Sequence, residues 1–195
     1  MEEIFGRRIE RVVDSTYGEG GERLTVKKPP LPDEGSVRGP HRQLKVAIGS
    51  DHRGLVLKGQ LKGYLLELGH TVVDCGADGH KPADYPDVAL SVSEKVARKI
   101  CDFGILIDAV GVGSGMAANK VKGIRAAVCH DVESARSSRL HNDANVLSLG
   151  ASTVNRGLAR RMVRIWLETP FEGGRHTPRI EKIAKIEREG LDARL

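Results

Sequence analysis

The sequence predicts an α/β fold, in which a five-stranded parallel sheet carries helices on both faces and follows a separate N-terminal segment. From residue 44 onward, short apolar runs alternate with amphipathic stretches of helical length. This alternation is typical of a parallel sheet covered on both sides. The chain has 195 residues, of which 39% are hydrophobic, enough for one ordinary core. We therefore expect one domain over residues 44–195 and an appendage over residues 1–43.

The elements of that domain carry individual signals. The runs 45–49 and 103–107 are largely apolar, as buried strands are. Pro86 suits the first turn of a helix, and Gly69 suits the end of the preceding helix. Strands are expected at 45–49, 71–75, 103–107, 125–129 and 145–149, and helices near 54–68, 86–99, 114–120, 131–141, 155–168 and 178–189.

The N-terminal segment has a different composition. Its first apolar residues fall on one helical face, with charged residues largely opposite, which predicts an amphipathic helix of about four turns. These apolar residues are Ile4, Phe5, Ile9, Val12 and Val13. Residues 17–43 are rich in glycine and proline, as a linker is. The helix either packs on the domain or a neighbouring subunit, or docks into a groove of another protein.

Charge and cysteine content exclude several classes of protein. The net charge is +5, but the basic residues are spread along the chain without a basic block or zinc-finger spacing, which argues against nucleic-acid binding. Cys75, Cys101 and Cys129 have no CxxC spacing, so we expect free thiols in a reducing cytoplasm and no metal site. No apolar stretch approaches the ~20 residues of a membrane span, and no secretion signal is evident. A soluble cytoplasmic protein is expected.

Polar groups follow two of the predicted strands. Asp51 and His52 follow the first strand, and Asp108 follows the third, just before the glycine loop 111–115. An open α/β sheet places its active site at such strand ends, and the glycines let backbone N–H groups approach an anion. The loop lacks the third glycine of a dinucleotide fingerprint, because Met116 stands there. Taken alone, these groups would also suit helix caps and tight turns.

Further candidates lie toward the C-terminus. His130 follows the fourth strand, and two arginines and a histidine, Arg175, His176 and Arg179, lie about one helical turn apart. Arginine gives bidentate hydrogen bonds to phosphate, so this cluster suits a sugar phosphate. A solvated charged face is the alternative.

Together these motifs identify a resemblance. From Leu44 to about Glu187 the chain resembles the type B ribose-5-phosphate isomerase family, which includes the two-subunit galactose-6-phosphate isomerases. The segments that carry the resemblance are Ala-Ile-Gly-Ser-Asp-His, Asp-Tyr-Pro, Gly-Val-Gly with Ala-Ala-Asn-Lys, Gly-Ile-Arg-Ala-Ala-Val-Cys-His-Asp, His-Asn-Asp-Ala-Asn-Val and Glu-Gly-Gly-Arg-His. The resemblance implies a Rossmann-like homodimer, or a tetramer, that interconverts aldose and ketose phosphates without metal or other cofactor.

The resemblance also implies roles for individual residues. His130 would help to open the furanose ring, and Asp51, His52 and Tyr85 would contact sugar hydroxyls. Two further groups would bind the substrate: an anion hole for the enediolate and a phosphate clamp divided between two chains. Asn142 would lie in the substrate site beside the anion hole. The hole would comprise Gly111, Val112, Gly113, Ser114 and Gly115, and the clamp Arg139, Arg175, His176 and Arg179.

The chain departs from the family at the base. Most members have a cysteine where this chain has Asp108, and a second branch has a glutamate where it has Ser114. Three alternatives follow. Asp108 is the base, with its pKa raised by desolvation against Ile107 and Val110; or the chain needs a cysteine-bearing partner; or it binds a sugar phosphate without turnover. The retained ring-opening and phosphate residues favour the first.

We therefore predict an isomerase that converts ribose 5-phosphate to ribulose 5-phosphate through an enediolate. The alternatives are a subunit of a six-carbon isomerase, for galactose or allose 6-phosphate, and a catalytically impaired sugar-phosphate-binding protein. The predicted N-terminal helix resembles the encapsulation peptides of bacterial microcompartments, so residues 1–16 would bind a microcompartment shell or another protein.

Overall fold

A computed structural model describes residues 3–4, 7–13, 22–26, 42–79 and 83–190, the first three ranges as strands only. The chain divides into two compact units, residues 1–39 and 40–195. Each unit is considered by itself.

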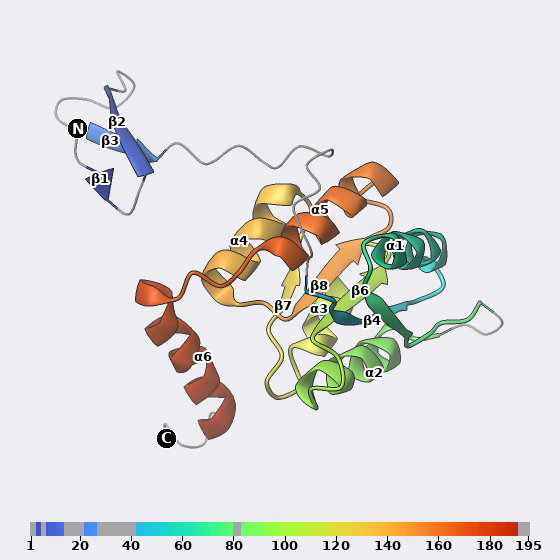
Figure 1. Ribbon diagram of the computed structural model, residues 1–195. Coiled ribbons are helices and arrows are strands. Elements are labelled where there is room, and N and C mark those ends of the chain that lie inside the picture. Colours follow the sequence, from blue (N-terminus) through green and yellow to red (C-terminus); the bar gives the residue numbers. More distant parts are fainter. Residues whose placement is uncertain (1–2, 5–6, 14–21, 27–41, 80–82, 191–195) are drawn as a thin grey trace. The chain divides into compact units, whose positions relative to one another are not determined.

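In the larger unit, parallel strands alternate with helices (Figure 1). The strands are β4 (Lys45–Ser50), β5 (Thr71–Asp74), β6 (Phe103–Asp108), β7 (Ala126–Val128) and β8 (Val146–Gly150). The helices are α1 (Leu55–Glu67), α2 (Tyr85–Ala97), α3 (Val112–Ala118), α4 (Val132–Asn142), α5 (Arg156–Glu168) and α6 (Thr177–Glu189), with the 3-10 turn η1 (Gly174–His176) before α6. The strand order is β5-β4-β6-β8-β7, and every pair is parallel. The predicted α/β class and five-stranded parallel sheet are confirmed.

The sheet separates two hydrophobic cores. Helices α1, α4 and α5 pack on one face, where Ile105 and Ile107 of the central strand β6 point, while α2 and α3 cover the other face, where Leu106 points. All three side chains are fully buried, because side chains alternate between the faces of a strand. On the second face, a Cβ at Gly104 would lie 2.7 Å from Val92, so the glycine lets α2 approach the sheet closely. The layers are therefore helix, sheet and helix.

The smaller unit corrects the predicted N-terminal helix. Its strands β1 (Glu3–Ile4), β2 (Arg7–Val13) and β3 (Glu22–Val26) pair antiparallel in the order β1-β2-β3. The helix prediction is wrong over 7–13, and the linker prediction is wrong over 22–26. Ile9, Val12 and Val13 are β-branched, which favours a strand, and pairing with β3 supplies backbone hydrogen bonds that periodicity alone does not reveal. The encapsulation-peptide hypothesis assumed an amphipathic helix, and residues 7–13 form a strand instead. The rest of 1–16 and of the linker lies largely outside the described residues.

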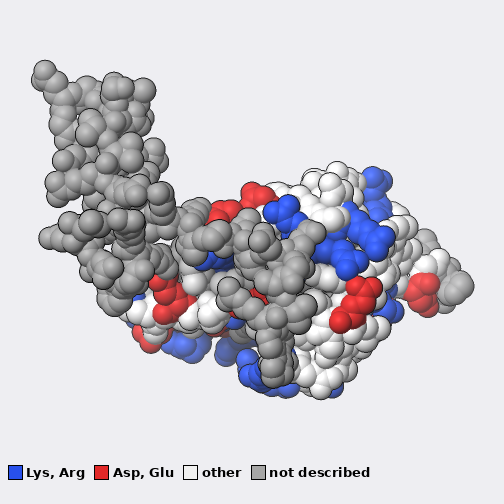
Figure 2. All heavy atoms as spheres, turned by 45° about the horizontal axis from the view of Figure 1, so that its top comes forward, with Lys and Arg blue, Asp and Glu red and all other residues white. Residues whose placement is uncertain are grey.

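The surface of the larger unit carries both signs of charge. On the face shown in Figure 2, Lys and Arg side chains form separate patches with Asp and Glu between them. The predicted scatter of basic residues is therefore visible there. Among the described residues, no helix is both long and apolar enough to cross a membrane.

Candidate active site

Two carboxylates follow neighbouring strands at the edge where the parallel strands end, called here the carboxyl edge. Ser50, the last residue of β4, lies opposite Ile107 of β6, and the amide of Asp51 donates to the Ile107 carbonyl at 3.2 Å. Asp51 and Asp108 therefore leave adjacent strands, about 5 Å apart at the backbone. The structure brings together these two residues, which the sequence selected separately.

Asp51 shapes the turn that leads into α1. Its Oδ1 accepts the amide of Arg53 at 2.8 Å and that of Gly54 at 3.1 Å. The residue is buried, while the next residue, His52, is exposed. Asp51 thus fixes the backbone that presents His52 to solvent at the carboxyl edge.

The carboxylate of Asp108 lies inside the glycine loop. Its Oδ1 accepts the amides of Val110, at 2.8 Å, and of Gly111, and its Oδ2 accepts the amide of Ser114 at 2.9 Å. Gly111 has φ 84°, which glycine adopts without strain, and its carbonyl accepts a hydrogen bond from Ser148 Oγ at 2.6 Å. Asp108 is only 5% exposed, so it is an anion enclosed by backbone donors.

Because of these hydrogen bonds, the pKa of Asp108 shifts in the direction opposite to the predicted one. Burial by itself raises the pKa of the carboxyl group, but hydrogen bonds from the side chain and amide of Ser114 and from the amides of Gly111 and Val110 outweigh burial and lower it. Donors that bind the ionised form favour that form. The expectation that the pKa of Asp108 is raised overall is therefore wrong, because it considered the apolar neighbours without the loop donors.

The same hydrogen bonds reduce the number of loop amides that can serve the predicted anion hole. The amides of Gly111 and Ser114 donate to Asp108, and that of Gly115 donates to the Gly111 carbonyl at 3.2 Å. The amides of Val112 and Gly113 belong to the first turn of α3, where the helix offers no acceptor. These two amides remain the backbone donors best placed for a ligand oxyanion.

Tyr85 and His130 reach the same edge from different elements. A Cβ at Gly113 would lie 2.8 Å from the Tyr85 ring, so Tyr85, at the start of α2, packs against the loop and remains partly exposed. His130 is exposed and follows β7, which β8 separates from β6. Two strand spacings amount to about 10 Å, so the backbones of His130 and Asp108 lie about that far apart along the carboxyl edge, with β8 between their strands.

Arg139 and Asn142 lie at the other edge of the sheet, where the strands begin, called here the amino edge. Helix α4 runs back from the end of β7 to the start of β8, and both residues are in its last turns. Arg139 Nη1 donates to Asp143 Oδ1 and to the Ala144 carbonyl, each at 2.7 Å. Its guanidinium lies 4.7 Å from the centroid of the Phe103 ring, at the start of β6. Within one chain, the structure separates both residues from Asp108 and packs Arg139 into the core.

A cluster of His141, Glu172, Arg175 and His176, called here the His141–His176 cluster, also lies at the amino edge. The two imidazole rings stack with centroids 4.5 Å apart and planes at 23°. Glu172 Oε2 lies 3.8 Å from His141 Nε2 and 3.6 Å from His176 Nε2, and Arg175 Nε lies 3.3 Å from His176 Nε2. Arg179 follows, exposed, one turn further along the chain. Three of the four predicted clamp residues are thus close in sequence and space.

The geometry of this cluster does not favour a metal ion. Ligand atoms of His141, Glu172 and His176 all lie within 4.8 Å of one another, the group that could hold a metal among the described residues. However, the rings are nearly parallel, so their nitrogen lone pairs do not converge on one point, and the Arg175 guanidinium beside His176 repels a cation. Burial, followed by His141 and Arg175, lowers the pKa of His176, while Glu172 opposes the shift.

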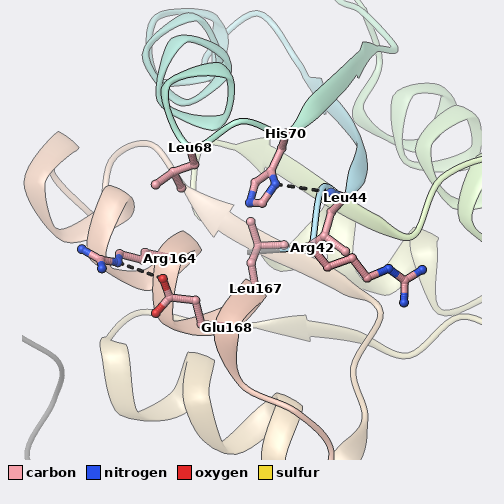
Figure 3. Close-up of a pocket in the computed structure, with 7 residues that line it drawn as sticks. All are labelled: Arg42, Leu44, Leu68, His70, Arg164, Leu167 and Glu168. Carbon is pink, nitrogen blue, oxygen red and sulfur yellow. Dashed lines mark hydrogen bonds and ion pairs between the residues drawn. The ribbon is translucent and has the colours of Figure 1, made fainter. Parts of the chain in front are cut away.

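A pocket of about 250 Å³ lies at the amino edge, away from Asp108 (Figure 3). Leu44 and His70 precede β4 and β5, and the amide of Leu44 approaches His70 Nδ1 at 3.4 Å. On another wall, Arg164 and Glu168 of α5 form a 3.0 Å ion pair. The pocket is lined by Arg42, Leu44, Leu68, His70, Arg164, Leu167 and Glu168. None of the predicted site residues lines it.

Comparison with known proteins decides the family. A model of the family described as Ribose/Galactose Isomerase matches residues 46–183. The chain belongs to this family. It is 46% identical to ribose-5-phosphate isomerase B of Escherichia coli K12 over 143 residues, which are 73% of this chain and 96% of that protein. It is 40% identical to D-erythrulose-4-phosphate isomerase of Pectobacterium atrosepticum over 148 residues, 75% of this chain and 97% of that protein.

The solved structures agree with this assignment. Ribose-5-phosphate isomerase B of Clostridium thermocellum superposes with a TM-score of 0.74 at 48% identity, over 75% of this chain and 99% of that one. The chain is therefore a sugar-phosphate isomerase of the ribose/galactose isomerase family, and its larger unit has the fold of the type B ribose-5-phosphate isomerases.

Sequence reasoning did not select three residues that the structure places in or beside these sites. Glu172 opens the Glu-Gly-Gly-Arg-His segment, so its position was available as a signal. The sequence gives no reason to select Ser148 as a site residue, because it is one polar residue within an apolar strand. Lys58 lies in a helix, yet it is buried, and its Nζ donates to Asp74 at 2.9 Å and to the Ala77 carbonyl at 2.5 Å. Ala77 in turn donates to the Ser50 carbonyl at 2.7 Å, so Lys58 holds the segment beside Asp51.

Proposed function

We propose that this isomerase converts ribose 5-phosphate to ribulose 5-phosphate through an enediolate, with Asp108 as the group that moves the proton between C2 and C1. The observation that supports this most directly is the position of Asp108, an enclosed carboxylate that shares one loop with the amides of Val112 and Gly113 in the first turn of α3. A base and oxyanion donors side by side are what an enolisation requires. The relatives from Escherichia coli and Clostridium thermocellum support the five-carbon substrate.

In the proposed reaction, Asp108 accepts the proton from C2 of the open-chain aldose, and the electrons of that bond form the C1–C2 double bond. The C1 carbonyl oxygen becomes an oxyanion, which the amides of Val112 and Gly113 stabilise. The proton of the C2 hydroxyl moves to the oxygen at C1, a carbonyl forms at C2, and Asp108 returns its own proton to carbon C1, which gives the ketose. His130 would assist ring opening, while Asp51, His52 and Tyr85 would bind hydroxyls. The lowered pKa keeps Asp108 ionised but makes it a weaker base.

The proposed phosphate clamp requires a second chain. Arg175, His176 and Arg179 lie at the amino edge of their own sheet, whereas Asp108 lies at the carboxyl edge. The six residues of β6 span about 20 Å, longer than a pentose phosphate. We therefore propose a homodimer in which each chain supplies the clamp to the other's site. Helix α6 supports a partner, because none of its side chains is buried and Ile183 and Ile186 are exposed.

Complementation tests the base and the shared site together. Asp108→Asn and Arg175→Ala chains are each expected to be nearly inactive as homodimers. Co-expressed in equal amounts, they form mixed dimers with one intact site, so turnover of ribose 5-phosphate should recover to about a quarter of the wild-type value. A clamp that served its own chain would give no recovery, and this outcome would reject the shared site.

Turnover of other sugars defines the substrate. The Pectobacterium relative is named for a four-carbon phosphate, so four-, five- and six-carbon aldose phosphates should be compared by kcat/KM. The enclosure of Asp108 by loop amides favours a second candidate, a protein that binds a sugar phosphate without turnover. Exchange of the C2 hydrogen with deuterium separates the two, because a binding protein produces none, whether or not a cysteine-bearing partner is added.

A further inference from the structure

Ser148 is a buried hydroxyl beneath the glycine loop. It lies between the apolar residues Leu147 and Leu149 in β8, an interior strand of the sheet, and it is fully buried. Its Oγ donates to the Gly111 carbonyl at 2.6 Å. A serine hydroxyl carries one hydrogen, and a buried hydroxyl without a partner destabilises a fold. This bond therefore joins the middle of the sheet to the loop.

Hydrogen bonds hold Gly111 from two strands. Its amide donates to the carboxylate of Asp108, at the end of β6. Its carbonyl accepts the Ser148 hydroxyl from β8 and the amide of Gly115 at 3.2 Å, which uses both lone pairs of that oxygen. The loop approaches the sheet closely because Gly115 has no side chain: a Cβ there would lie 2.5 Å from Val128 and 3.6 Å from the Ser148 Cβ. Rotation of the Gly111 carbonyl would therefore break two hydrogen bonds.

The bond from Ser148 also sets the direction of the Val112 amide. The Gly111 carbonyl and the Val112 N–H belong to one trans peptide group, and in such a planar group the C=O and N–H bonds point in opposite directions. The carbonyl points to Ser148, in the buried layer between α3 and the sheet, so the Val112 N–H points away from that layer. Glycine has no Cβ to oppose the reversed orientation. The hydrogen bonds on the carbonyl therefore keep the amide facing outward.

We propose that Ser148 is a positioning residue for the isomerisation, which holds the Gly111–Val112 peptide so that the Val112 amide faces the oxygen where negative charge develops. This inference rests on the proposed function, which assigns that amide to the enediolate oxygen. The amides of Gly111 and Ser114 already donate to Asp108, so the orientation of each remaining loop donor matters more. The charge develops only as the proton leaves C2, so Ser148 should affect kcat rather than substrate binding.

The test compares two serine variants of the full-length protein. Ser148→Ala removes the hydroxyl and should lower kcat for ribose 5-phosphate by about 5- to 50-fold, between the effect of one hydrogen bond and that of a lost oxyanion donor, with KM nearly unchanged. Ser138→Ala is the matched control. Ser138 is also buried, but in α4 on the other face of the sheet, where its Oγ donates to the Ala135 carbonyl at 2.8 Å and accepts the indole N–H of Trp166 at 3.1 Å. It should lose stability in chemical denaturation but keep the wild-type kcat.

A binding measurement tests the same point without turnover. A hydroxamate that carries a phosphate group has a planar pair of oxygens like those of the enediolate, and such a mimic binds through the groups that stabilise the reacting state. In titration calorimetry, Ser148→Ala should bind this probe more weakly than the wild type, by the same factor as the loss of kcat. Both proteins should bind inorganic phosphate equally well.

The outcomes separate this inference from the proposed function. Unchanged kcat and unchanged hydroxamate affinity in Ser148→Ala would reject the positioning role, while a loss of turnover in Asp108→Asn would still support the proposed function. A rise in KM at constant kcat, an equal loss of kcat in Ser138→Ala, or no hydroxamate binding by the wild type would also reject the positioning role. Weaker hydroxamate binding by Ser148→Ala, with no C2 exchange in the wild type, would support the positioning of the loop amide and reject the isomerase.

Discussion

Asp108 and Ser114 are joined by a 2.9 Å hydrogen bond in which the Ser114 amide donates to the carboxylate. This bond ties the end of β6 to the first turn of α3, across the glycine loop. Asp108 therefore holds the loop, in addition to being the proposed base. Substitutions at Asp108 can separate the two roles.

Asp108→Asn should lower turnover of ribose 5-phosphate by about 10²–10⁴-fold, the usual effect of removing a general base. Asp108→Cys should recover part of the turnover, with the acid limb of its pH–rate profile at higher pH, because a thiol ionises near ~8.5 and an aspartate near ~3.9. The measurements are pH–rate profiles and C2 deuterium exchange. Asp102→Asn is the control, since Asp102 also accepts a backbone amide, that of Lys45 at 2.7 Å, but at the amino edge. Equal turnover in wild type and Asp108→Asn would remove Asp108 from the mechanism.

The lowered pKa of Asp108 also predicts how stability depends on pH. The folded pKa lies below the unfolded value near ~3.9, so the ionised carboxylate stabilises the fold above the unfolded pKa. This contribution is lost as the pH falls through the folded pKa. Between pH 7 and pH 3, the free energy of unfolding should therefore fall more for the wild type than for Asp108→Asn. Urea denaturation at both pH values measures the difference, and identical losses would contradict the prediction.

Arg139 and Arg175 should differ in what they support. Arg139 is buried against Phe103 and hydrogen-bonds Asp143 and Ala144, so Arg139→Ala should lower the free energy of unfolding by about 2 kcal/mol or more. Arg175 is exposed, so Arg175→Ala should leave stability nearly unchanged and raise KM. Chemical denaturation and steady-state kinetics on both variants check this pair. The reverse pattern would place Arg139 in the clamp and Arg175 in the fold.

Removal of residues 1–39 should leave the isomerase intact. These residues form a compact unit of their own, and both hydrophobic cores draw their described residues from position 44 onward. The shortened chain should match the full chain in melting temperature and in turnover of ribose 5-phosphate. Calorimetry and a turnover assay suffice, and a large drop in either would show that the N-terminal unit supports the domain.

Much of the larger unit was predictable because its signals are local. Val46 and Ile48, in β4, are apolar and fully buried, and the alternation of such runs with helical stretches was enough to predict the sheet. The helix prediction for the N-terminal unit failed because Ile9 and Val13 are four residues apart, a spacing that places both on one face of a helix or of a strand. Only pairing with Glu22–Val26 decides between them, and pairing is not a local property.

The candidate site likewise has features that local sequence signals predict and features that depend on distant residues. The positions of Asp51 and Asp108 followed from strand ends, but the pKa of Asp108 depends on the amide of Ser114, six residues further on. The place of Arg139 could have been predicted, since a helix between two parallel strands returns to the amino edge. The contact of Glu172 with His141 could not, because 31 residues separate them along the chain.

An aspartate, Asp108, stands where the family resemblance implies a cysteine base. This has a consequence for how the enzyme should respond to oxidants. The cysteines that remain are free, Cys101 and Cys129 buried and Cys75 half-buried, and burial raises the pKa of all three thiols. Thiols held protonated react slowly with peroxides and alkylating agents. With Asp108 as the proposed base, the reaction needs no reactive thiol, and the chain should keep its activity under oxidative conditions that inactivate an enzyme with a cysteine base.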